Sequence, residues 1–287
     1  MSLAAESRAM RVSTSAAACV LLWMSRTVLA LFASYPLLLA VRATSMTAGP
    51  EGDAVLFQPG SLMLLELLRL GGPSLFSAGE FALVLLGVFA ILELIPLAMA
   101  LDLLALPNRA LRERLARAIQ VFPRFLALGL LTLLLQAALL LASNLLTAAV
   151  KPVLASADER LQSLLPIALM GLGLMGCGWV GAVLDIARAT VVTRTFDEVG
   201  ARAAFAEAVN CLRQKPLRVL VGPYPSVAGS ALAVLAATWF SARSVAVPSS
   251  SAALAFAFVT HQVAMLFSIA WRVRWLNAAL ELSAECD

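Results

Sequence analysis

The chain has 287 residues, of which 61% are apolar and 13% are charged. Soluble domains are about 45–50% apolar and about 25% charged, so this composition excludes an ordinary soluble domain and indicates a protein surrounded by lipid. The net charge of +4 comes without a basic patch interleaved with aromatic residues. We therefore expect no nucleic-acid partner.

Six segments are long and apolar enough to cross a bilayer, which takes about 20 residues of helix each. They lie near residues 27–46, 81–101, 126–148, 164–184, 226–246 and 252–271. No stretch is left over for a separate soluble domain. The sequence therefore predicts an all-α fold, in which residues 1–287 form a single integral membrane domain, a polytopic helical bundle of about six transmembrane helices.

Arg26 interrupts the first apolar run, "LLWMSRTVLALFASYPLLLAVR" at residues 21–42. In one interpretation Arg26 lies at the cytoplasmic interface and the span begins after it, with residues 13–25 as an interfacial or embedded lead-in. In the other, the span is centred on Arg26, which pairs with a buried acid such as Glu93, because an unpaired charge inside a span is costly. Since the run continues past any small-residue cleavage pattern, we interpret it as an anchor and not as a cleavable signal peptide.

The basic residues predict the orientation of the spans, because Lys and Arg near span ends are retained in the cytoplasm. With the N-terminus inside, 15 of the 21 basic residues lie on the cytoplasmic side and 5 on the opposite side. The remaining one, Arg26, is counted on neither side. We therefore expect both termini of the chain to be cytoplasmic.

Two segments echo each other, "LRERLARAIQVFPRFLAL" at 111–128 and "AFAEAVNCLRQKPLRVLV" at 204–221, with Pro123 aligned on Pro216. We expect both to be amphipathic interfacial helices that lie flat on the cytoplasmic side of the membrane, with their apolar faces on lipid. The alternative is a coincidental match between two cytoplasmic loops. In the first segment the predicted apolar face comprises Leu111, Leu115, Ala118, Ile119 and Phe122, and the predicted polar face comprises Arg112, Glu113, Arg114, Arg117 and Gln120.

The six-span plan, the interfacial helix before a span and the stretch "LDIARATVVTRTFDEVGARAAFAEAVNCLRQKPLRVL" at 184–220 resemble a group of uncharacterised bacterial inner-membrane proteins. This group includes the membrane domains attached to some glycerophosphodiester phosphodiesterases. The resemblance covers residues 80–240, and the catalytic domain of those hydrolases is not found in this sequence, so no phosphodiesterase chemistry carries over. What the resemblance implies is a multi-pass protein of the bacterial inner (plasma) membrane.

The spans contain few polar residues, and polar residues at that depth are candidates for function because they are costly there. The candidate intramembrane residues are Glu93, His261, Gln262 and Asn144. Glu93 and His261 lie near the midpoints of their spans, and a carboxylate beside a histidine at equal depth would form a proton relay. The alternative is that each side chain hydrogen-bonds its neighbours and holds helices together.

Three further candidates, Arg26, Asp185 and Arg188, are predicted at the inner surface. Asp185 and Arg188 are three residues apart and therefore share one helical face. Asp102 ends the second span much as Asp185 ends the fourth. We interpret these carboxylates as anchors rather than as a reactive site.

All four cysteines, Cys19, Cys177, Cys211 and Cys286, fall in the membrane or on its inner side, so we expect four free thiols. With one histidine in the chain, no Cys/His spacing predicts a zinc site, and we expect no metal ion or other cofactor. The sequence contains no phosphate-binding lysine motif, nucleophile elbow or glycine-rich dinucleotide turn. It therefore favours a protein that is not an enzyme over a membrane-embedded hydrolase.

Small residues recur at every fourth position in two spans, at Gly173, Cys177 and Gly181 and at Gly229, Ala233 and Ala237. This spacing lets helix backbones approach closely. The alternative is that the pattern only reflects the abundance of glycine and alanine in the chain.

Two hypotheses of function remain. The first is a noncatalytic scaffold or accessory component of an envelope complex, whose partners are membrane lipid and a membrane or cytoplasmic protein, because basic interfacial helices suit an anionic surface. The second is a small-solute or lipid transporter that uses polar residues at the bilayer midplane, because transporters are often built from repeats.

The bias in basic residues generates a topological prediction. Cysteines introduced near Ser156 and Ser249 are expected to react with an impermeant maleimide added outside intact cells. Cysteines introduced near Asn108 and Val199 are expected to react only after permeabilisation, because the positively charged segments are retained inside. Labelling near Asn108 in intact cells would contradict the predicted orientation.

Overall fold

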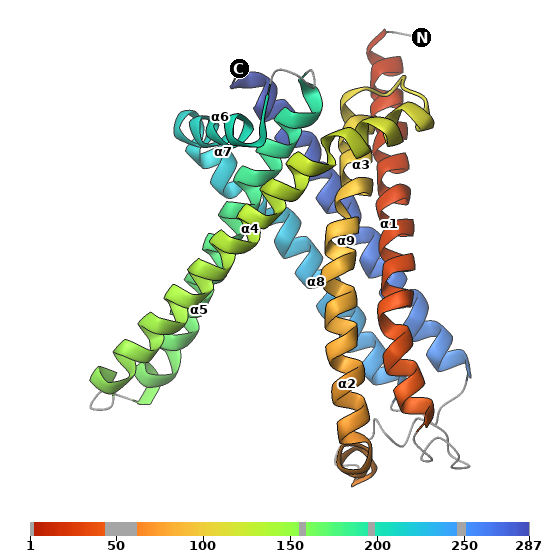
Figure 1. The fold of residues 1–287 in the computed structure, drawn as a ribbon, viewed down its shortest axis with the longest axis vertical. Helices are drawn as coiled ribbons and strands as arrows, with labels where there is room; N and C mark the ends of the chain where they lie inside the picture. Colours follow the sequence, from red (N-terminus) through yellow and green to blue (C-terminus); the bar gives the residue numbers. More distant parts are fainter. Residues whose placement is uncertain (1–2, 44–61, 155–158, 195–198, 246–250, 287) are drawn as a thin grey trace. The chain divides into compact units, whose positions relative to one another are not determined.

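The structure is a computed structural model that describes residues 3–43, 62–154, 159–194, 199–245 and 251–286. Within these ranges the chain forms helices and no strand, which confirms the all-α prediction. The helices in chain order are α1 (Leu3–Ala43), α2 (Leu62–Leu92), α3 (Leu94–Ala105), α4 (Leu111–Leu154), α5 (Glu159–Thr193), α6 (Ala201–Gln214), α7 (Pro216–Val221), α8 (Tyr224–Val245) and α9 (Ser251–Glu285) (Figure 1). The positions Ser156 and Ser249 lie outside the described residues.

Six helical stretches among the described residues are long and apolar enough to cross a membrane, which confirms the prediction of a multi-pass helical bundle. They are Val12–Pro36, Gly79–Ala105, Leu111–Pro152, Leu164–Thr193, Pro216–Ser241 and Ala255–Glu285. Many large apolar side chains on these helices are exposed, as Leu134 at 70% and Phe81 at 56% illustrate. Such faces suit a solvent of lipid, in which the helix satisfies its own backbone hydrogen bonds.

The first apolar stretch of the structure starts before residue 27. Helix α1 continues without a break through Arg26, and its apolar stretch covers Val12–Pro36, so residues 13–25 belong to the same helix as the residues after Arg26. The segment "STSAAACVLLWM" is apolar on all sides, and a helix without a polar face has nothing to hold it flat at the interface. Where the membrane begins along α1 stays a prediction, and the predicted end at residues 44–46 lies outside the described residues.

Helices α2 and α3 are separated by one residue, Glu93. Pro96 has no N–H group, so the carbonyl of Leu92 loses the donor that a continuous helix would supply, and the helix is interrupted. The chain resumes its helical path at once, because the N–H of Leu97 donates to the carbonyl of Glu93 at 3.1 Å. The break therefore falls at the acidic residue inside the second span.

The two segments predicted to be matching interfacial helices fold differently. The second segment contains a separate helix, because α6 ends at Gln214 and α7 begins at Pro216. A residue before proline is forced out of the helical region, and Lys215 has φ −131° and ψ 56°. The first segment is continuous with its span, since α4 runs through Pro123 without a break. The two segments therefore differ in whether a helix ends before the proline, and their placement at the membrane interface stays a prediction.

The apolar faces of these segments are also covered differently from the prediction. In α6, Ala204 and Ala208 are buried and the helix packs against α5, so protein and not lipid covers this face. In α4, Arg114 of the predicted polar face is 4% exposed, whereas Leu111 of the predicted apolar face is 70% exposed. The amphipathic pattern fails here because Arg114 binds the buried carboxylate of Asp102.

The described chain divides into two compact units. The first unit comprises Met1–Thr14, Ala98–Val227 and Arg272–Asp287, and the second comprises Ser15–Leu97 and Ala228–Trp271. In the first unit, α5 forms the core, because residues 182–192 are all buried. A helix buried on every side must pair each polar group that it carries.

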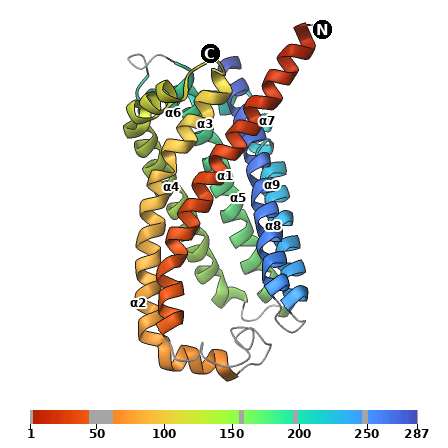
Figure 2. The ribbon, with the colours of Figure 1, turned by 90° about the vertical axis from the view of Figure 1, so that its right-hand side faces the viewer.

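In the second unit, α1 crosses α2 at an angle and α8 lies beside α9 (Figure 2). Helix α1 lies beside α2, where the ring centroids of Phe32 and Phe89 are 6.4 Å apart. Helix α8 approaches α9 at Gly229, where a Cβ atom would lie 2.8 Å from the indole nitrogen of Trp271. Gly229 therefore leaves room for an indole ring, whereas the prediction concerned a close approach of helix backbones.

The small residues of α5 likewise permit a close approach to α4. A Cβ atom on Gly173 would lie 2.9 Å from the Cβ of Ser143. The hydroxyl of Ser143 donates to the carbonyl of Leu169 at 2.7 Å, and the side-chain amide of Gln136 donates to the carbonyl of Cys177 at 3.0 Å. Polar side chains therefore join the two helices where small residues bring the backbones together.

This close approach predicts that Gly173→Ala destabilises the protein. The added methyl group would force α4 and α5 apart, and we expect a loss of about 1–3 kcal/mol in unfolding free energy. The measurement is thermal unfolding of the purified protein in detergent. Gly178→Ala is the control, because a Cβ there meets open space. Equal losses in the two variants would contradict the proposed contact.

Candidate functional site

A buried carboxylate lies in the core of the first unit. Asp185 of α5 is 1% exposed, and an ionised carboxylate tolerates burial only when donors replace the water that it loses. Arg272 of α9 binds it in a bidentate manner, with Nη1 donating to Oδ2 at 2.5 Å and Nη2 donating to Oδ1 at 2.7 Å. Trp275 Nε1 donates to Oδ2 at 2.9 Å, and Arg188 Nη1 donates to Oδ1 at 3.1 Å. These four residues are the Asp185 cluster.

The Asp185 cluster joins α5 to the C-terminal half of α9. An ionised carboxylate accepts about four hydrogen bonds, so the two oxygens of Asp185 are saturated. Arg272 and Trp275 are three residues apart on α9 and share one face. Trp275 also packs closely against Gly222, the residue that follows α7, because a Cβ atom added there would lie 2.6 Å from the indole ring. The cluster therefore fixes α5, α7 and α9 together.

A second buried carboxylate, Asp102 near the end of α3, is 2% exposed. Arg109 Nη1 lies 2.8 Å from its Oδ1, and Arg114 Nη1 lies 3.3 Å from its Oδ2. Arg117 Nε lies 3.5 Å from Oδ1, within the range of an ion pair. These four residues are the Asp102 cluster, which joins α3 to the first turns of α4.

The arginines of the Asp102 cluster also bind carbonyl groups at helix ends. Arg114 Nη2 donates to the carbonyls of Leu106 and Pro107, which follow α3, at 2.9 and 2.7 Å. Arg117 Nη2 donates to the carbonyl of Val192, in the last turn of α5, at 2.6 Å. The last carbonyls of a helix lack partners within it, and cationic side chains there also interact favourably with the helix dipole. Arg117 thereby connects α4 to α5.

Positive charge exceeds negative charge in both clusters. The Asp185 cluster contains one carboxylate and two guanidinium groups, and the Asp102 cluster contains one carboxylate and three. The partial negative charge at the ends of α3 and α5 offsets part of this excess. The carboxylate oxygens of both clusters accept hydrogen bonds from guanidinium groups of other helices or turns. Each cluster is therefore suited to joining helices.

Sequence reasoning found part of the Asp185 cluster. The structure brings Asp185 and Arg188 together as predicted, as an ion pair within one helix. It adds two partners that were missed, Arg272 and Trp275. The sequence does show that Arg272 and Trp275 are three residues apart and share one face of a helix. It contains no local pattern that indicates contact between that face and α5.

In the second unit, Arg26 pairs with Glu93. Arg26 Nε donates to Glu93 Oε1 at 2.5 Å, and the side chains are 38% and 31% exposed. About one turn before Arg26, Trp23 Nε1 donates to Gln262 Oε1 at 3.1 Å. The structure therefore shows the pairing of the second interpretation of Arg26, in which an acid within the spans compensates the charge.

The other candidate residues of the spans have local partners. His261 Nδ1 lies 3.2 Å from the hydroxyl of Ser241 and 2.9 Å from the carbonyl of Ala257. Asn144 donates to the carbonyl of Leu140 on its own helix at 2.9 Å. Glu93 and His261 thus have different hydrogen-bond partners, and the predicted carboxylate–histidine relay is not among the contacts of the described residues.

Two of the four cysteines form a disulfide, so the expectation of four free thiols is wrong. Cys211 of α6 is bonded to Cys286, which follows α9, across 75 residues of sequence. Cys19 and Cys177 are free. The sequence did not reveal the pair because only the folding of α6 against the end of α9 brings these sulfurs together. Among the described residues, no group of His, Cys, Asp and Glu side chains is arranged to hold a metal ion.

These features define an α-helical, multi-pass membrane protein whose buried charges join its helices. Comparisons with protein families, curated proteins and solved structures find no match to this chain. Its role must therefore be inferred from its own geometry.

The Asp185 cluster predicts a strong and nonadditive effect of substitution. Asp185→Asn leaves two guanidinium groups without their counterion, and we expect a loss of about 3–5 kcal/mol in unfolding free energy. Arg272→Gln is expected to cost a similar amount, and the double variant less than the sum, because partners in one network couple. Thermal unfolding in detergent measures each loss, with Glu113→Gln on the exposed face of α4 as the control. Additive losses would contradict the network.

Proposed function

We propose that the protein is a noncatalytic scaffold or accessory component of an envelope complex in the bacterial inner membrane, with both termini in the cytoplasm. The observation that carries this proposal is the way the first unit holds α6. Protein covers the apolar face of this helix, where Ala204, Ala208 and Cys211 are buried against the unit. The opposite face is left for a partner.

The exposed side of α6 is polar and basic. We define the α6 outer face as Arg202, Asn210, Arg213 and Gln214, all of which are exposed. Basic side chains beside a membrane suit anionic headgroups or an acidic protein surface, and the bias in basic residues favours a cytoplasmic location for them. A rigidly held polar helix on a membrane anchor is suited to docking a cytoplasmic protein.

The two buried carboxylates support a noncatalytic role. Buried acids are the usual source of perturbed acid and base groups in active sites. Here guanidinium groups bind both Asp102 and Asp185, so the carboxylate oxygens are occupied as acceptors. Their chemistry is therefore used for joining helices.

Site-specific photo-crosslinking tests this proposal in living cells. A photoreactive amino acid at Asn210 or Arg213 is expected to give a protein adduct of discrete mass, and Arg202→Glu in the same chain is expected to weaken it by reversing charge on the docking face. The matched control is Leu134, a 70% exposed position on a span, which is expected to crosslink to lipid. No protein adduct at either α6 position, or the same adduct at Leu134, would contradict the proposal.

A second candidate function, a small-solute or lipid transporter, is favoured by the second unit. The partly exposed ion pair of Arg26 and Glu93 and the hydrogen bond between Trp23 and Gln262 place polar groups within apolar spans. Ionisable residues within spans often mark a substrate or ion pathway.

Water access to Glu93 distinguishes the two functions. A pathway would let an impermeant thiosulfonate reach Glu93→Cys from one side of the membrane, whereas a structural ion pair in lipid would leave this cysteine unreactive. The scaffold proposal predicts no reaction, as for Leu86→Cys, a 51% exposed apolar position on the same span. Reaction at position 93 with none at position 86 would favour the transporter.

A further inference from the structure

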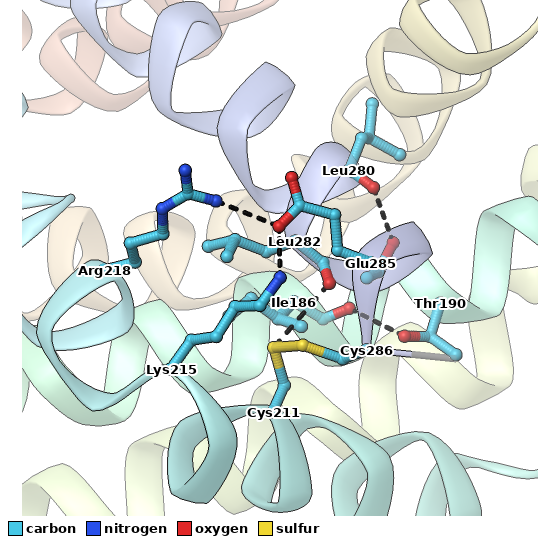
Figure 3. Close-up of a disulfide and its surroundings, with 10 residues drawn as sticks. Ile186, Thr190, Cys211, Lys215, Arg218, Leu280, Leu282, Glu285 and Cys286 are labelled. Atoms are coloured by element: carbon cyan, nitrogen blue, oxygen red, sulfur yellow. Dashed lines mark hydrogen bonds and ion pairs between the residues drawn. A yellow bond between two sulfur atoms is a disulfide. The ribbon is translucent and has the colours of Figure 1, made fainter.

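The disulfide connects α6 to the residue that follows α9 (Figure 3). The Cα atoms of Cys211 and Cys286 are 5.4 Å apart, within the range that a disulfide requires. Cys211 is 1% exposed, whereas Cys286 is partly exposed. Cys211 is therefore the more sheltered residue of the pair.

Charged side chains hold the same two segments together without the sulfur atoms. Glu285, next to Cys286, binds both Lys215 at the end of α6 and Arg218 of α7, the latter at 2.9 Å (Figure 3). Because these ion pairs and the packing of α6 do not depend on the sulfur–sulfur bond, the bond can open while the helices stay in contact.

A recess of about 10 Å³ lies beside the disulfide, which is room for about one water molecule. It is lined by Ile186, Thr190, Glu207, Cys211, Ser283 and Cys286. The carboxylate of Glu207 lies 3.4 Å from Arg194, which offsets its charge. Because the recess is too small for a thiol of the glutathione class, such a thiol would approach from outside, where Cys286 is the more exposed residue of the pair.

We propose that Cys211 and Cys286 form a thiol–disulfide exchange site, which a low-molecular-weight thiol of the glutathione class opens and the corresponding disulfide closes. The bias in basic residues favours a cytoplasmic location for this end of the molecule. Disulfides there are transient and redox-active rather than permanent. The exchange is independent of whether the α6 outer face binds a protein.

The reaction balances as two successive exchanges. A thiolate attacks the sulfur of Cys286, a mixed disulfide forms, and Cys211 leaves as a thiolate that takes up a proton. A second thiolate attacks the small-molecule sulfur of the mixed disulfide, which releases the oxidised small molecule and leaves Cys286 as a thiol. Two small thiols are thereby oxidised to one disulfide while the protein is reduced to the dithiol, and the reverse sequence closes the bond.

The state of the bond changes how firmly α6 is held. In the oxidised form a covalent link closes a long loop between α6 and the end of α9, which restricts the unfolded chain. In the reduced form only packing and the ion pairs of Glu285 remain. The site therefore couples the redox state of the surrounding thiols to the stability of the fold that holds α6.

The test uses the full-length protein in detergent, in a Cys19→Ser/Cys177→Ser background that leaves only this pair. After equilibration in buffers from mostly reduced to mostly oxidised glutathione, free thiols are trapped with a large maleimide and counted by gel shift. Both thiols are expected to appear and disappear together and reversibly, with the oxidised form melting about 5–10 °C higher. Cys286→Ser is expected to remain folded and to lose this redox dependence of melting.

Two results would overturn the proposal. A disulfide that stays closed in reduced glutathione and opens only after denaturation would be a permanent structural link. Thiols that stay free in oxidised glutathione would show that the pair does not exchange. In intact cells trapped with acid, the pair is expected to be mainly reduced before and oxidised after treatment with diamide, and an unchanged state would also contradict the proposal.

Discussion

The charge of Asp185 is the constraint on which the rest of the first unit depends. This carboxylate lies within a stretch of α5 that is buried on every side, so water cannot solvate it. Its donors come from its own helix and from Arg272 and Trp275, which lie on α9. Satisfying one buried charge therefore fixes where a distant helix must lie, and the packing of Trp275 on Gly222 extends that constraint to the end of α7.

The Asp102 cluster applies the same principle to the neighbouring helices. Its arginines bind one carboxylate and the free carbonyls after α3 and in the last turn of α5, so groups that a helix end leaves unsatisfied become the contacts between helices. Near these helix ends the first unit contains many ion pairs, whereas the spans expose apolar side chains. The polar face of α6 is consequently presented on a well-connected base, as the proposed docking of a partner requires.

The sequence was sufficient for those features that depend on composition and local spacing. The six apolar spans follow from hydropathy, the pair of Asp185 and Arg188 follows from their spacing, and the close packing at Gly173 follows from the small residues of α5. The pairing of Arg26 with Glu93 was one of two open interpretations, because a charge inside a span has few ways to be compensated.

The features that escaped prediction depend on contacts between distant parts of the chain. An amphipathic pattern assumes that every polar residue faces water, and it failed at Arg114 because a buried carboxylate offered a better partner than solvent. The prediction from the amphipathic pattern failed at α6 because an apolar face can be covered by protein instead of lipid. Cys211 and Cys286 are 75 residues apart, and no local pattern indicates that two such cysteines meet.

Hydrogen exchange of the protein in lipid nanodiscs, compared between the wild type and Arg272→Gln, tests the central claim most directly. If the Asp185 cluster holds the end of the first unit together, the amides of residues 201–221 in α6 and α7 will lose at least tenfold protection in the variant, equivalent to about 1.4 kcal/mol of opening free energy. The amides of α2 in the second unit should be unchanged. Unchanged protection of residues 201–221 would contradict the account.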